Sequence, residues 1–210
     1  MKMTNRKFSI SIFTVLFMMI GISIDAQDLA TFQAKACVAC HGQKAEGNML
    51  LQAPSLRGLH KEYIMRQLNN FKSGARGAHK EDVNGITMSA NAKVLSDGDI
   101  EKLATELSAL SPLKNASTVA GSPHEGKEKF VTCQACHGAD LKGNVQLNAP
   151  PLIGLQDWYI VNQLKKFQKS IRASSPETDP IGFTMNAFSN MLANESEIRN
   201  VAAYIVSVSK

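Results

Sequence analysis

Two short segments carry residue types that can bind a metal or a prosthetic group. Residues 37–42 read CVACHG, and residues 133–138 read CQACHG. Each segment places two thiols three positions apart with a histidine directly after the second thiol, and together they use all 4 cysteines of the chain. Such a cysteine pair can hold zinc, act as a redox dithiol, form a structural disulfide or attach a haem, so four chemistries have to be compared.

The surrounding residues favour one of these chemistries. Structural zinc needs four ligands, but each motif supplies three adjacent donors, and the other cysteine pair belongs to a distant segment. A thioredoxin-like dithiol would need a βαβ pattern, which the chain lacks, and a structural disulfide would leave the histidine without a role. Cys-x-x-Cys-His is the spacing of covalent haem c attachment. We therefore predict two haem c groups, attached at Cys37 and Cys40 and at Cys133 and Cys136, with iron ligands His41 and His137.

Besides the histidine of its motif, each haem iron has a second axial position, for which the candidates are a methionine or a further histidine. Met88 and Met185 match each other between the two halves, because each follows a threonine and precedes a leucine by seven residues. Both lie where a loop between helices would return to the distal face of the haem, so we predict them as the distal ligands. Met191 is the nearest competitor of Met185. The remaining candidates are assigned to packing (Met49, Met65, Met191) or to the surface (His60, His79, His124).

This ligand set bears on the kind of chemistry. An iron held between histidine and methionine has no vacant position for oxygen or peroxide, and methionine raises its reduction potential relative to a second histidine. The sequence thus favours electron transfer over catalysis, and we expect neither an enzyme nor a small-molecule substrate.

The two motifs belong to a long internal repeat. GNMLLQAPSLRGLHKEYIMRQLNNF (47–71) matches GNVQLNAPPLIGLQDWYIVNQLKKF (143–167) at an offset of 96, and the segments that hold the two methionines match at an offset of 97. A period of this length indicates a duplicated domain. Residues 111–123 (SPLKNASTVAGSP) have the composition of a linker. We predict one domain over 27–111, a linker over 112–123 and a second domain over 124–210.

The apolar residues recur at helical spacing. We expect three main helices in each half, over 28–36, 61–71 and 100–110 and over 125–132, 157–167 and 198–208, with Ser96 and Asp99 spaced as a capping box. No strand pattern is found. The segments between these helices are long, which suits loops wrapped around a large prosthetic group. The predicted fold is therefore all-α, with a haem completing the core of each small half.

The first residues resemble a targeting segment. Lys2, Arg6 and Lys7 precede an uncharged stretch over 8–24, and Ala26 offers a small residue for cleavage. We predict a signal peptide over 1–26 and a periplasmic protein, with an uncleaved membrane anchor as the alternative. The formal net charge is +5, of which +2 belongs to residues 1–26. The remaining charge is too small to indicate nucleic-acid binding.

With these residues assigned, the chain resembles the dihaem cytochromes of the c4 type, which are tandem class I cytochrome c domains. The resemblance covers about residues 28–208 and rests on the two motifs, on the APSLRGLHKEYIMRQLNNFKSGAR segment with its partner, and on the LSDGDIEKLA tail. It implies that the carbonyls of Pro54 and Pro150 accept hydrogen bonds from the proximal histidines, and that the domains pack about a pseudo-twofold axis. Arg76 and Arg172 also match; we expect them in solvent, with haem propionates as the alternative contact.

The resemblance implies an electron carrier between a respiratory donor complex and a terminal oxidase or reductase, with redox proteins as its partners. One alternative is an electron-accepting cytochrome subunit of a membrane-associated dehydrogenase complex. Another is a dihaem peroxidase, which the matched methionines disfavour because it needs an iron with an open position.

Overall fold

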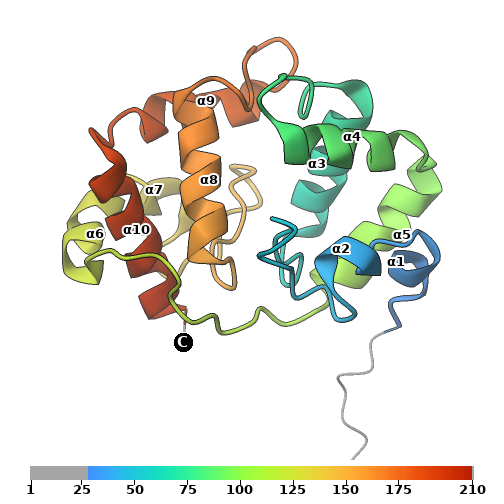
Figure 1. The fold of residues 1–210 in the computed structure, drawn as a ribbon, viewed down its shortest axis with the longest axis horizontal. Helices are drawn as coiled ribbons and strands as arrows, with labels where there is room; N and C mark the ends of the chain where they lie inside the picture. Colours follow the sequence, from blue (N-terminus) through green and yellow to red (C-terminus); the bar gives the residue numbers. More distant parts are fainter. Residues whose placement is uncertain (1–27, 210) are drawn as a thin grey trace, which may run out of the picture.

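The computed structural model describes residues 28–209, which contain ten helices and no β-strand (Figure 1). The first half holds α1 (Ala30–Ala34), α2 (Val38–His41), α3 (Lys61–Ser73), α4 (Val83–Lys93) and α5 (Asp97–Ser108). The second half repeats the order with α6 (Pro123–Phe130), α7 (Gln134–His137), α8 (Asp157–Gln168), α9 (Pro180–Ser189) and α10 (Glu195–Val208). The all-α prediction is confirmed. The expected signal peptide lies outside the described residues.

The last helix of each half forms the core as the apolar spacing predicts. In α5 the stripe is buried, and the capping box joins Ser96 and Asp99, with each side chain accepting a hydrogen bond from the other residue's backbone N–H. In α10 the equivalent stripe is buried as far as Ile205, but Val208 is 45% exposed, so its predicted burial is wrong. Val206 and Ser209 in the same turn are buried, so only one side of the last turn of α10 faces solvent.

Two helices, α4 and α9, occupy segments expected to be loops. Each begins at an aspartate cap: Asp82 accepts a hydrogen bond from the N–H of Gly85, and Asp179 accepts one from the N–H of Gly182. Such caps satisfy N–H groups that a helix start leaves without partners. The matched methionines therefore lie on capped helices, which fixes their positions more firmly than a loop would.

The helices α6 and α10 approach so closely that a side chain has no room between them. A Cβ on Gly126 of α6 would overlap the backbone carbonyl of Asn200 in α10. In the first half, α1 is held to α5 differently, because the Glu106 carboxylate accepts hydrogen bonds from the backbone N–H groups of Thr31 and Phe32. Each contact positions the helix that leads into a Cys-x-x-Cys-His motif.

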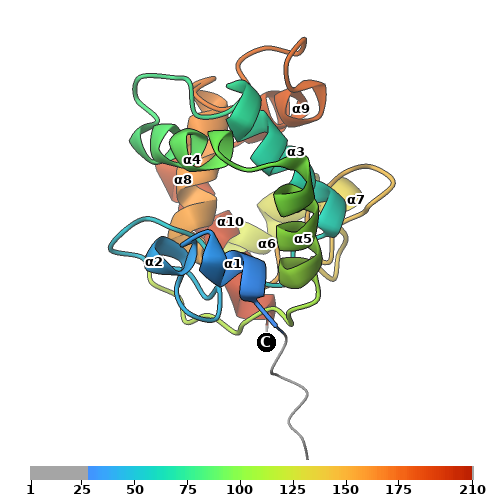
Figure 2. The same ribbon diagram turned by 90° about the vertical axis from the view of Figure 1, so that its right-hand side faces the viewer.

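The two halves lie side by side, with α3 and α8 on the facing sides (Figure 1); Figure 2, turned by 90°, brings the first half to the front. The segment between α5 and α6 is held against the second half. Asp157 is buried and accepts hydrogen bonds from the backbone N–H groups of Thr118 and Val119 and from the hydroxyls of Ser117 and Thr118. The predicted linker is thus a fixed strap that limits how far the halves can separate.

No helix within residues 28–209 combines the length and the apolar composition that crossing a membrane requires. The membrane-anchor alternative concerns residues 8–24, which lie outside the described part of the chain.

Candidate haem-binding cavities

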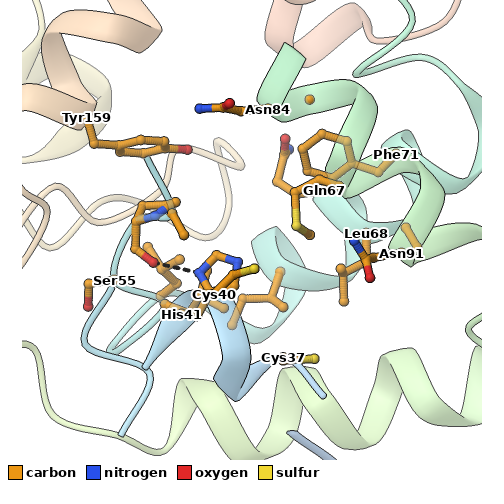
Figure 3. Close-up of a pocket in the computed structure, with 18 of the residues that line it drawn as sticks. Cys37, Cys40, His41, Ser55, Gln67, Leu68, Phe71, Asn84, Asn91 and Tyr159 are labelled. Atoms are coloured by element: carbon orange, nitrogen blue, oxygen red, sulfur yellow. Dashed lines mark hydrogen bonds between the residues drawn. The ribbon is translucent and has the colours of Figure 1, made fainter. Parts of the chain in front are cut away.

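The first motif forms a short helix whose last residue faces a cavity. Cys37 caps α2, which carries Cys40 and His41, and the His41 ring is buried. Its Nδ1 donates a hydrogen bond to the Pro54 carbonyl at 2.8 Å, which confirms the predicted contact (Figure 3). This bond fixes the ring orientation and leaves the Nε2 lone pair for a metal. Burial lowers the pKa of His41, only partly offset by the bond to Pro54, so the ring favours the neutral form that binds metals.

The second motif repeats this geometry. His137 ends α7, is buried, and its Nδ1 donates to the Pro150 carbonyl at 2.9 Å. Burial again lowers the pKa of the imidazole, with the hydrogen bond to Pro150 acting in the opposite direction. The pKa values of the two histidines are therefore shifted in the same direction, and each ring donates to the equivalent proline carbonyl, as in a duplicated metal site.

The cysteines do not pair with one another. None of the four forms a disulfide, and burial raises the pKa of Cys37 and Cys133. Among the described residues, no group of three or more His, Cys, Asp and Glu side chains is placed to hold a metal ion by itself. The thiols are thus available to a prosthetic group that brings its own metal.

Each motif opens into a cavity that also contains its matched methionine. A cavity of about 270 Å³ is lined by Cys37, Cys40, His41 and Met88, the last from α4. A second cavity of about 160 Å³ is lined by the equivalent residues, Cys133, Cys136, His137 and Met185, the last from α9. The structure therefore brings together all eight residues predicted as attachment points or ligands, four around each cavity.

The other candidate ligands lie elsewhere. Met191 is 57% exposed and lines neither cavity, and the three remaining histidines, His60, His79 and His124, line neither as well. Met65 packs against the core as expected, whereas Met49 and Met191 are exposed, so the assignment of these two to packing is wrong. The exposure of Met191 removes it from reach of the second cavity.

The expectation that Arg76 and Arg172 lie in solvent is wrong, because they are only 8% and 5% exposed. Arg76 donates to Gln67 of its own half at 2.8 Å and to Gln163 of the other half at 3.1 Å. Arg172 does the reverse, donating to Gln163 at 2.7 Å and to Gln67 at 3.0 Å. The contacts are related by the pseudo-twofold symmetry that the resemblance implies.

Two tyrosines complete this network. Arg76 donates to the Tyr159 hydroxyl and Arg172 to the Tyr63 hydroxyl, each across the interface. Both tyrosines, together with Gln67 and Gln163, line both cavities, while each arginine lines only the cavity of its own half. Figure 3 shows Tyr159 and Gln67 bordering the same space as Cys40 and His41. The sequence contained a signal for this group, since all its members match in the repeat and the glutamines lie on the apolar faces of their helices.

The arginines also test whether a haem fits here. Each guanidinium is stacked over a phenylalanine, neither has a carboxylate among its hydrogen-bond partners, and the buried Nε of each has no partner. Buried charges in proteins are normally paired with an opposite charge. A haem brings two propionate carboxylates, which supply the missing anions, so the residues present fit this group.

Comparisons with known proteins agree with this geometry. The family model for cytochrome c matches residues 29–110 and again residues 123–209. A thiosulfate dehydrogenase electron acceptor from Stutzerimonas stutzeri strain A1501 is 31% identical over 199 residues, which are 90% of this chain and 86% of the relative.

Solved structures of other proteins are similar to this chain as well. The cytochrome c4 of Acidithiobacillus ferrooxidans superposes with a TM-score of 0.68 at 30% identity, covering 83% of this chain and 99% of that one. A thiosulfate dehydrogenase from Marichromatium purpuratum also gives a TM-score of 0.68, at 27% identity over 83% of this chain and 37% of that one.

Proposed function

The chain belongs to the cytochrome c family, with two such domains in tandem that each bind a covalent haem c, and from this premise we propose that it carries single electrons between a respiratory donor and a terminal oxidase or reductase. The observation that carries the proposal is that a matched methionine lines each cavity together with a buried histidine. With a histidine and a methionine as its ligands, a haem iron would exchange electrons without binding a substrate.

The proposed ligands follow from this placement. Cys37 and Cys40 attach the first haem, with His41 and Met88 on its iron; Cys133, Cys136, His137 and Met185 serve the second in the same way. The haem iron supplies the one-electron chemistry when it is bound. The protein's own contribution is to orient the two imidazoles through Pro54 and Pro150, and to enclose the sites in apolar side chains.

The boundaries and the location are also proposals. We place the domains at 27–111 and 124–210 with a linker at 112–123, and the removal of residues 1–26 on export to the periplasm. Support for the linker comes from its lack of helix between α5 and α6, and the family matches end and resume within one residue of these limits.

A second candidate function is a dedicated electron acceptor of a dehydrogenase. The relative from Stutzerimonas stutzeri is named as the electron acceptor of thiosulfate dehydrogenase, and the matching part of the Marichromatium purpuratum protein is 37% of a longer thiosulfate dehydrogenase chain. The donor in this case is a thiosulfate-oxidising enzyme that passes electrons one at a time to the two haems. The acceptor is a terminal oxidase or reductase, as in the first function.

Rapid mixing tests both functions on the haem-loaded protein. Oxidised protein is mixed with thiosulfate dehydrogenase and thiosulfate, and reduced protein is mixed separately with a terminal oxidase and with a terminal reductase, while the haem absorption is followed. Under either function we expect one of these acceptors to reoxidise the protein. Reduction in the first mixture identifies the dehydrogenase as donor, and a failure of both acceptors to reoxidise the protein would contradict the carrier function.

A further inference from the structure

A charged pair crosses the interface at the first cavity. Lys166, on α8 of the second half, places its Nζ 2.6 Å from Oδ1 of Asp82 in the first half. The Asp82 side chain is 3% exposed and the Lys166 side chain 22%, so the pair is largely shielded from water. Asp82 is also the cap of α4, the helix that carries Met88, and both charged residues line the first cavity.

The second half lacks an equivalent pair. Asp179 caps α9 as Asp82 caps α4, but the position equivalent to Lys166 is Asn70, and Asp179 makes no ion pair within residues 28–209. The cation that reaches the second cavity from the other half is Arg66, which donates to the carbonyl of Asn148 at 2.9 Å instead of to a carboxylate. The cross-interface cations of the two cavities therefore come from non-equivalent positions, and only the first is bonded to a carboxylate.

We propose that Lys166, held by Asp82, adjusts the reduction potential of the first haem without affecting the second. The proposal rests on the proposed function, because it takes a haem in the first cavity with Met88 as its ligand. An oxidised haem carries one more positive charge than a reduced one. A nearby cation therefore favours reduction and a nearby carboxylate opposes it, most strongly where water is excluded.

This arrangement gives the second domain a direct effect on the first site. Lys166 moves with α8, so its charge reaches the first cavity only while the two halves are packed together. The carboxylate that it neutralises belongs to the first half and remains there. Lys166 is thus a positioning and tuning residue that acts on the haem through its charge and through the cap of α4.

The test uses variants of the complete haem-loaded protein and a spectroelectrochemical titration that resolves both haems. Lys166→Met should lower the potential of the first haem, and Asp82→Asn, which keeps a good helix cap, should raise it. Each should change the equilibrium of electron exchange between the haems by on the order of fivefold. The double variant should return close to the wild-type value, and the second haem should not move.

Lys165→Met is the matched control. Lys165 is the neighbour of Lys166 on α8 and pairs at 2.9 Å with Glu195 of its own half, so its loss removes the same charge on the outside of the molecule. Neither potential should move in this variant. In the Met88→Ala protein only the second haem should keep its wild-type potential. Its titration therefore shows which of the two redox transitions belongs to which haem.

Three results would overturn the proposal: unchanged potentials in Lys166→Met, shifts of the same sign in both single variants, or equal shifts of both haems. Shifts of one sign would show loosening of α4 instead of a charge effect. Failure of the proposed function itself is visible earlier, because the wild-type protein would then lack a second haem or the spectrum of a histidine–methionine iron.

Discussion

At the scale of single residues, the two methionines give the sharpest test of the sites. Met88→Ala and Met185→Ala should each remove about half of the weak near-infrared absorption of ferric haem with histidine–methionine ligands, because each removes one sulfur from one iron. Absorption spectra of the oxidised proteins measure this. Met191→Ala is the control and should leave the band whole, since this side chain is exposed. If Met191→Ala halved the band and Met185→Ala did not, the ligand assigned in the second domain would be wrong.

The site residues differ in how far the sequence alone could assign them. The motifs and the matched methionines were predictable because their chemistry depends on local spacing and on repetition. The burial of Arg76 and Arg172 was not predictable, because an arginine is usually exposed and its partners here come from the other half of the chain. Lys166 gave no sequence signal, because the matching position in the first half is the uncharged Asn70, although its partner Asp82 does match Asp179.

At the scale of helices, the crossing of α6 and α10 is the tightest contact in the path to the second motif. Gly126→Ala should destabilise the protein by about 1–3 kcal/mol, because the added methyl group forces the helices apart. Gly98→Ala in α5 is the control: the nearest atom to its added Cβ is 3.9 Å away. That variant should gain about 0.5–1 kcal/mol through helix propensity. Urea unfolding followed by circular dichroism measures both, and equal effects of the two substitutions would contradict the tight crossing.

The helices also differ in how far the sequence could predict them. The apolar spacing predicted α3, α5, α8 and α10, because each of these helices buries large apolar side chains on one face. It missed α4 and α9, because their buried positions are small or polar residues such as Gly85, Ser89 and Ala92, which leave no apolar stripe. These helices are defined by an aspartate cap and by the cavity they close, and neither is visible in hydrophobic periodicity.

At the scale of the whole molecule, two buried arginines lie at the interface between the halves, and their partners decide how they affect stability and reduction potential. If Gln67, Gln163 and the tyrosines were their only partners, replacing both arginines by methionine would relieve two desolvated charges and increase stability. If each guanidinium balances a haem propionate, the same replacement leaves buried carboxylates without partners. The unpartnered Nε atoms of both residues favour the second case.

We therefore expect the Arg76→Met, Arg172→Met double variant of the haem-loaded protein to lose about 3–5 kcal/mol of stability, the usual effect of breaking a buried ion pair. Both reduction potentials should fall as well, because the remaining negative charges favour the oxidised iron. The matched control, Arg76→Lys with Arg172→Lys, keeps the charges but loses the planar fork that bonds several acceptors at once. It should therefore keep its potentials close to those of the wild type while losing part of the stability. Urea unfolding followed by haem absorbance, with a redox titration of each protein, separates the two cases, and a methionine variant more stable than the wild type would rule out the propionate contacts.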